Sequence, residues 1–160
     1  KQIIIYKLMN WKLPKFGHVP LIHGSDGAKL SKRHGALSVL RYKELGYLSE
    51  AFNNYLMRLG WGHKNQEIFS IPQAVSLFDI SNIGKSPARF DIAKLNYLNS
   101  HYIKNIDYAQ LISFSSFKKL FNSSNKDMVN KLVLLYRESM ENLNVLQEGL
   151  NYVINYIGNT

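Results

Sequence analysis

The chain has 160 residues, 46% of them hydrophobic, so it can bury the core of one domain or of two small ones. It has no cysteine, which excludes disulfides and cysteine-based zinc sites, and no apolar run approaches the roughly 18 residues that cross a bilayer. The formal net charge of +9 favours a polyanionic partner such as nucleic acid or nucleotide phosphate, although mere solubility is the simpler explanation.

The first 35 residues predict a short helix and then a hairpin. Apolar residues between 3 and 11 recur at helical spacing, and the helix is expected to end near Asn10. Residues 18–23 are apolar and extended, and they meet the turn sequence Gly24-Ser25-Asp26-Gly27. Residues 28–30 are then the second arm of the hairpin. The chain begins without an initiator Met, and we expect it to be a piece of a longer soluble polypeptide with no membrane partner.

Helices are expected along most of the remaining chain. A helix over residues 37–45 ends at Gly46, which tolerates a left-handed backbone. The next helices begin at residues whose side chains commonly cap a helix N-terminus, namely Ser49, Ser70 with Gln73, Asp91, and Asp107 with Gln110. The helix after Asp107 is expected to reach Leu120.

Two apolar stripes at helical spacing predict a C-terminal helical core. One stripe contains Met128, Val129, Leu132, Leu135 and Tyr136, and the other Leu143, Leu146, Leu150, Val153 and Ile157. The predicted fold class is mainly α with one hairpin near the front, and a boundary is expected near residues 105–107.

The hairpin leads into a basic loop, residues 26–35, in which three cations surround Ser31 and glycines flank the cluster. Lysine ammonium groups can follow a triphosphate as point charges, and glycine permits close approach to a ligand. Such a loop suits phosphate binding, although a basic turn is also typical of a solvated surface.

Lys29-Leu30-Ser31-Lys32-Arg33 is similar to the KMSKS signature of class I aminoacyl-tRNA synthetases. The neighbouring phrases His18-Val-Pro-Leu-Ile, Asn54-Tyr-Leu, Lys85-Ser-Pro and Lys94-Leu-Asn occur in the order found in bacterial-type glutamyl-tRNA synthetases. The chain resembles that family closely over residues 1–105, and beyond them by helical pattern alone.

The resemblance implies three parts. Residues 1–35 would be the end of a class I catalytic domain, residues 36–106 a helical stem-contact subdomain, and residues 107–160 the start of an α-helical anticodon-binding domain.

The resemblance also implies a ligase that activates glutamate with ATP and passes it to the 3′ end of tRNA(Glu). Lys32 would be the main phosphate ligand and Lys29 would assist, with Leu30, Ser31 and Arg33 completing the ATP-binding loop; Mg²⁺ would enter with ATP. The family's other ATP signature is absent and glutamate would bind mainly upstream, so the isolated piece is expected to be inactive. A cytoplasmic monomer is expected.

Six residues are candidates for tRNA phosphate contacts: Arg41, Lys43, Lys85, Ser86, Arg89 and Lys94. Each is also explained as an ordinary solvated residue. Trp61 and Tyr97 suit either base stacking or, more simply, the core. The five histidines show no metal-ligand spacing, and no metal site is predicted.

Two other functions compete with this one. A non-catalytic helical RNA-binding module would explain the basic helices but has no need of the phosphate loop. A glutaminyl enzyme would share the loop but would continue into β-barrels, whereas helical stripes follow residue 105 here.

Overall fold

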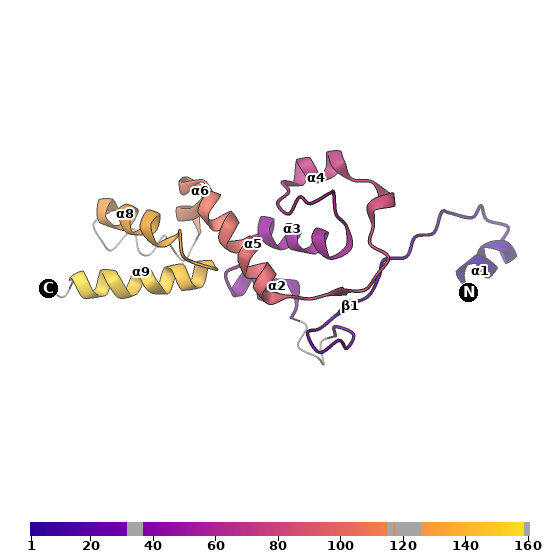
Figure 1. The fold of residues 1–160 in the computed structure, drawn as a ribbon, viewed down its shortest axis with the longest axis horizontal. Coiled ribbons are helices and arrows are strands. Elements are labelled where there is room, and N and C mark those ends of the chain that lie inside the picture. Colours follow the sequence, from indigo (N-terminus) through magenta and orange to yellow (C-terminus); the bar gives the residue numbers. More distant parts are fainter. Residues whose placement is uncertain (32–36, 115–116, 118–125, 159–160) are drawn as a thin grey trace.

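The computed structural model describes residues 1–31, 37–114, 117 and 126–158, and Figure 1 shows them as an elongated, mainly helical chain. None of the helices in these ranges is both long and apolar enough to cross a membrane. The predicted mainly α fold class is confirmed. The described elements are α1 (Gln2–Leu8), β1 (Ile22–His23), α2 (Val39–Glu44), α3 (Ser49–Gly60), α4 (Ile71–Leu77), the 3-10 helix η2 (Ile80–Asn82), β2 (Ala88–Arg89), α5 (Ile92–Asn105), α6 (Tyr108–Ser113), α8 (Lys126–Tyr136) and α9 (Leu143–Gly158).

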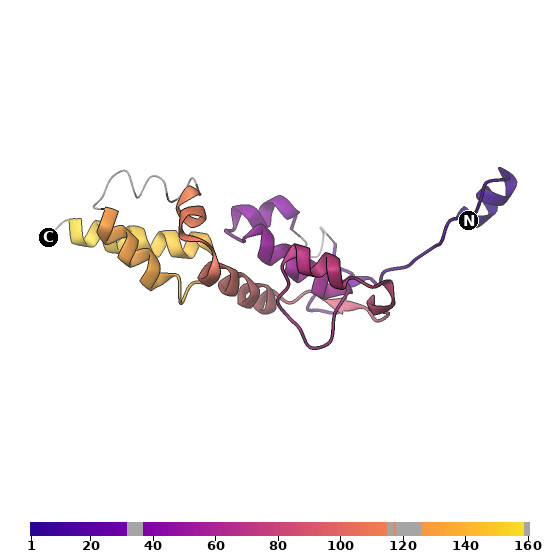
Figure 2. The same cartoon turned by 90° about the horizontal axis from the view of Figure 1, so that it is seen from above.

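Helix α1 lies at one end of the molecule, away from the other helices in both views (Figures 1 and 2). It ends at Leu8, and Asn10 follows with a left-handed φ of 56°, close to the expected end. The ring of Tyr6 meets Trp11 and Phe16 edge to face, with centroids 5.6 and 6.4 Å apart. The other apolar side chains of α1 are exposed, with Leu8 80% exposed, so this segment has little core of its own.

Three of the predicted N-caps are confirmed. The side chains of Ser70, Asp91 and Asp107 accept hydrogen bonds from backbone N–H groups in the first turns of α4, α5 and α6. The prediction for Ser49 is wrong, because Leu48 is the N-cap of α3 and the Ser49 hydroxyl instead donates to the Glu50 carboxylate. The α3 start is held differently, since the Leu48 N–H donates to Asn99 Oδ1 at 2.8 Å.

The packing of α3 against α5 forms the middle of the molecule, and Figure 2 shows the two helices near its centre. Their shared core contains Phe52, Tyr55, Leu95 and Leu98, with Tyr42 of α2 stacked on Phe52 at 4.6 Å between ring centroids. A smaller cluster of Trp61, Phe69 and Ala74 lies beside it. This core is the platform on which the strands rest.

A second core joins α8 and α9 to the ends of α3 and α5. It includes Leu143, Leu146 and Leu150, as predicted from the stripe on α9. The stripe predicted on α8 is partly wrong, because Val133 is buried while Leu135 is 69% exposed. An apolar stripe in the sequence predicts the buried side of a helix only approximately. The packing of the neighbouring helix determines which residues at the margin of that side are buried.

This second core also bears on the predicted subdivision. Leu48 and Ala51, which precede the boundary expected near residue 106, pack in the same cluster as Leu111, which follows it. The division therefore stays a prediction, and the expected boundary at residue 35 lies outside the described residues. Helix α6 ends at Ser113, earlier than the expected Leu120, because Phe114 has an extended backbone.

Gly46 lies where α2 meets the start of α9. Its φ is +86°, and a Cβ built on it would approach Asn144 N to 2.7 Å and Leu143 N to 3.0 Å. Its carbonyl oxygen accepts the Leu143 N–H at 2.9 Å, so the backbones are in direct contact. Glycine is therefore required here both for conformation and for space.

We predict that Gly46→Ala lowers the free energy of unfolding by about 2 kcal/mol or more, because a left-handed alanine is strained and its methyl group crowds backbone atoms. Gly60→Ala is the matched control, since a Cβ there meets nothing within 4 Å. Urea denaturation of both variants measures the difference. Equal stabilities would contradict the close contact at Gly46.

Candidate functional site

The predicted hairpin is present and is built around β1. The Leu30 N–H donates to the Ile22 carbonyl at 2.9 Å, and the Gly24 N–H donates to the Ala28 carbonyl at 2.8 Å. His23 and Lys29 form an antiparallel bridge. The arms and the turn are therefore those expected from the sequence.

The turn of the hairpin is closed by local hydrogen bonds. The Gly27 N–H donates to the Gly24 carbonyl at 3.0 Å, and Gly27 has a left-handed φ of +78°. The Asp26 carboxylate accepts the Ala28 N–H at 3.0 Å. This geometry explains the Gly-Ser-Asp-Gly sequence, because an Asx-type bond and a glycine both favour a tight turn.

The basic loop follows the second arm directly. Lys29 is exposed, whereas Leu30 and Ser31 are half-buried. The remaining predicted phosphate ligands, Lys32 and Arg33, lie outside the described residues. The hairpin thus presents the exposed side chain of Lys29 immediately before the rest of the predicted loop.

Strand β2 was not predicted, and it ties the hairpin to the helices. It runs parallel to β1, with Ile22 opposite Ala88 and His23 opposite Arg89. The Ala88 N–H donates to the Leu21 carbonyl at 3.2 Å, and the Phe90 N–H donates to the His23 carbonyl at 2.8 Å. A two-residue strand paired so far along the chain leaves no local periodicity, which is why sequence patterns missed it.

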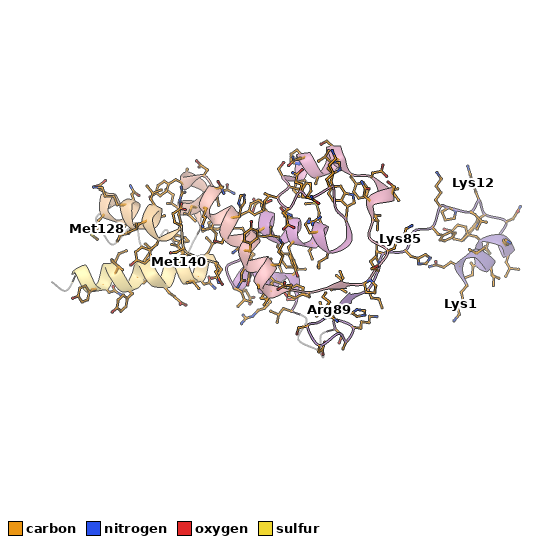
Figure 3. All side chains as sticks on the ribbon, in the orientation of Figure 1. Lys1, Lys12, Lys85, Arg89, Met128 and Met140 are labelled. Atoms are coloured by element: carbon orange, nitrogen blue, oxygen red, sulfur yellow. The ribbon has the colours of Figure 1, made fainter. Side chains whose placement is uncertain are left out.

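Arg89 extends from β2 toward the hairpin turn, where Figure 3 labels it. Its Nη2 lies 3.9 Å from the position that a Cβ on Gly27 would occupy. Arg89, Gly24, Ser25 and Leu30 line an open hollow of about 490 Å³ that continues to the start of α5. The structure therefore brings predicted tRNA residue Arg89 beside the predicted phosphate loop.

Lys85 and Ser86 are exposed in the segment that leads from η2 into β2, and Figure 3 labels Lys85 there. They precede Arg89 on the same connection to the hairpin, so three predicted contacts lie within five residues of one another along the chain. Arg41 and Lys43 are exposed on α2, where the Arg41 guanidinium pairs with Glu44 at 2.7 Å. Such an exposed pair contributes little to stability.

Lys94 differs from the other candidates because it is engaged within the protein. Its ammonium group forms an ion pair with Glu67, which also meets the Arg58 guanidinium at 3.4 Å. The hydrogen bond from Lys94 lowers the pKa of the Glu67 carboxyl, with further lowering by Arg58. Lys94 also lies 5.1 Å from the centre of the Tyr97 ring.

Of the two aromatic candidates, Trp61 is buried and Tyr97 is exposed. Trp61 is buried, and its Nε1 donates to the Asp79 carbonyl at 3.3 Å, which confirms the core role expected of it. The core role expected of Tyr97 is wrong, because its ring is 58% exposed on α5. Leu95 and Leu98 lie on the buried face of that helix, and position 97 lies on the exposed face.

Comparison with known proteins shows the family to which the chain belongs. The sequence model of the family described as tRNA synthetases class I (E and Q), catalytic domain, matches residues 1–97. The chain belongs to this family of class I tRNA synthetases for glutamate and glutamine.

Curated relatives agree in naming one specificity. The chain is 44% identical over 160 residues to glutamate–tRNA ligase 2 of Rhizorhabdus wittichii, covering 96% of this chain and 34% of that protein. It is 46% identical over 155 residues to glutamate–tRNA ligase of Francisella tularensis subsp. novicida, covering 95% of this chain and 33% of the relative. The resemblance to glutamyl-tRNA synthetases is confirmed, and it continues past residue 105.

Solved structures support the fold. A crystal structure of a glutamate tRNA ligase from Elizabethkingia meningosepticum superposes with a TM-score of 0.79 at 27% identity, over 92% of this chain and 34% of that one. The chain therefore spans about a third of the length of the relatives it matches.

We predict that Glu67→Gln frees Lys94 and steepens the salt dependence of nucleic-acid binding, adding about 1 to the slope of log affinity against log salt. Asp127→Asn is the charge-matched control, since it releases the remote Lys131, which lies 2.9 Å from Asp127. Binding titrations at several salt concentrations measure the slope. An equal slope in both variants would assign the change to net charge alone.

The lowered pKa of Glu67 sets the pH range of this effect. The carboxylate stays ionised in the folded protein as pH falls to the ordinary glutamate pKa of about 4.3, so the ion pair is lost only below it. The difference between Glu67→Gln and the unmodified protein should therefore persist from neutral pH down to that range and disappear in stronger acid.

Proposed function

We propose that this chain is the section of a glutamate–tRNA ligase that carries the ATP phosphate loop and the first tRNA-contacting helices. The observation that carries the proposal is the hairpin, which ends in an exposed Lys29 and leads at once into Ser31, Lys32 and Arg33. The family of the chain and the ligase names of its relatives support the same function.

The proposed reaction explains why cations are needed in this loop. A glutamate carboxylate oxygen attacks the α-phosphorus of ATP, the bond to the β-phosphate breaks, and pyrophosphate leaves with the bonding electrons. Lys32 and Lys29 stabilise the negative charge that grows on pyrophosphate, so they act more strongly on the transition state than on bound ATP. A ribose hydroxyl at the 3′ end of the tRNA then attacks the glutamyl carbonyl, and AMP leaves.

The loop's other residues have supporting roles. Leu30 is half-buried on the second arm of the hairpin and holds the loop to its base. Ser31 and Arg33 complete the ATP-binding segment. Mg²⁺ would enter with ATP on its phosphate oxygens, and glutamate would bind in the part of the enzyme outside this chain.

The proposed tRNA surface starts at the hairpin. Lys85, Ser86 and Arg89 form its nearest part, and Arg41, Lys43 and Lys94 extend it over α2 and α5. These residues contact phosphates of tRNA(Glu) without reading bases. The complete enzyme would act as a monomer in the cytoplasm.

The alternative is a helical RNA-binding module without catalysis. Such a module needs the basic surface but not the hairpin, so the two functions differ in what the loop lysines do. Loss of pyrophosphate chemistry with intact tRNA binding identifies the ligase.

We predict that Lys32→Ala and Lys29→Ala, each in the complete enzyme, reduce glutamate-dependent ATP–pyrophosphate exchange while tRNA affinity stays within about twofold. The expected loss is roughly ten- to a thousandfold for Lys32 and smaller for Lys29, as for removal of one charge contact to a transition state. Lys131→Ala, in an exposed ion pair far from the hairpin, is the control. Unchanged exchange in both loop variants would refute the phosphate-loop assignment.

We predict that the chain alone binds tRNA through phosphates, with little preference for tRNA(Glu) over other tRNAs. About four contacts would weaken affinity by up to roughly a hundredfold between about 50 and 200 mM salt. Changing Lys85 and Arg89 together to alanine should flatten this dependence more than changing the exposed helix residues Lys7 and Lys131. Tight, salt-insensitive binding of tRNA(Glu) only would contradict the proposal.

A further inference from the structure

Among the described residues, the base of the hairpin is bonded to one other strand, β2. Besides the bonds within the hairpin, β1 is bonded to the segment 88–90, in which the Phe90 N–H donates to the His23 carbonyl at 2.8 Å. His23 is in turn bridged to Lys29. His23 is therefore the one residue between Phe90 and Lys29, the first lysine of the loop, along this path.

The segment 88–90 is held by the central core. The Phe90 ring packs edge to face on Tyr55, with centroids 5.3 Å apart, and also meets Tyr42 at 6.0 Å. The next residue is bound directly, because the Asp91 N–H donates to the Tyr55 hydroxyl oxygen at 2.6 Å. Tyr55 thus holds two consecutive residues, one by its ring and one by its oxygen.

Tyr55 is well suited to hold this point. It is on α3, its side chain is 2% exposed, and it packs with Leu95 and Leu98 of α5. Burial raises the pKa of Tyr55 above its ordinary value, so its hydroxyl stays neutral over the physiological pH range. A buried tyrosine hydroxyl is normally retained where it has a specific partner, and here that partner is the backbone that joins β2 to α5.

We propose that Tyr55 is a positioning residue for the phosphate loop, acting through Asp91, Phe90 and His23 on Lys29. The Tyr55 hydroxyl touches neither ATP nor tRNA in this arrangement; it sets where the hairpin stands relative to α3 and α5. The inference rests on the proposed function for its catalytic consequence, because misplacing a transition-state ligand slows activation. Its structural part, the link from Tyr55 to the hairpin, stands on the hydrogen bonds alone.

A matched control exists in the second core. Tyr102 on α5 is half-buried against that core, and its hydroxyl lies 2.9 Å from Asn54 Oδ1 and 2.8 Å from the Phe69 carbonyl. It holds the segment before α4 and has no bond to β1 or β2. Tyr102→Phe therefore removes a comparable hydroxyl from the core without touching the path to the hairpin.

The test compares Tyr55→Phe with Tyr102→Phe in the complete enzyme, after thermal melting has shown both to be folded. In ATP–pyrophosphate exchange, Tyr55→Phe should lower kcat by about ten- to a hundredfold with the KM for glutamate unchanged, as expected for a small misplacement of a catalytic group. Tyr102→Phe should stay within about twofold of the unmodified enzyme.

Hydrogen exchange gives a second readout that does not depend on activity. Tyr55→Phe should accelerate amide exchange about tenfold in peptides covering residues 19–31 and 86–92, whereas Tyr102→Phe should do so only around residues 66–70. Three results would each overturn the inference. They are unaltered amide exchange in the hairpin of Tyr55→Phe, equal losses of activity in the two variants, and accelerated amide exchange in the hairpin with full activity. An unmodified enzyme that shows no ATP–pyrophosphate exchange with tRNA(Glu) present would instead refute the proposed function, and amide exchange would still decide the link to Tyr55.

Discussion

The crossing of α3 and α5 is the contact on which the other parts depend, and each helix carries a buried asparagine there. Asn54 of α3 donates to the Glu67 carbonyl and accepts the Phe69 N–H, so it holds the segment before α4. Asn99 of α5 accepts the Leu48 N–H and donates to the Glu141 carbonyl, so it holds the start of α3 and the approach to α9. Replacing either amide with an apolar group leaves buried backbone groups unpaired, which costs more than the lost packing.

The residues that pack at this crossing are different from the candidate binding residues. The candidate binding residues Lys29, Lys85 and Arg89 are exposed, and they lie in or near short strands that have almost no core of their own. Their placement comes from rings and hydroxyls behind them. The cations also differ in their surroundings. Lys94 forms an ion pair with Glu67, whereas Arg89 is directed to the hairpin turn, so the two differ in how readily they could bind an anion.

Local signals in the sequence predicted local structure. Asp91 and Ser70 cap helices because their side chains reach N–H groups two or three residues away, and Gly24 to Gly27 predict a turn for a similar reason. The start of α3 was predicted wrongly, because the Leu48 N–H there is bonded to Asn99, which lies far along the chain. Strand β2 and the hydrogen bond from Asp91 to Tyr55 were missed because both arise from pairing between distant segments. The phosphate loop was predicted from residue order and stays a prediction, since Lys32 and Arg33 lie outside the described residues.

The parallel pairing of residues 22–23 with residues 88–89 also orders events during synthesis. The hairpin leaves the ribosome well before its partner strand, and sequence-distant pairings form late because a long loop must close first. Until α5 has docked on α3, nothing in the described chain holds β1 on its outer side. Lys29 is thus made before the strand that pairs with its hairpin, so a nascent chain arrested between the two strands would carry the hairpin without that pairing.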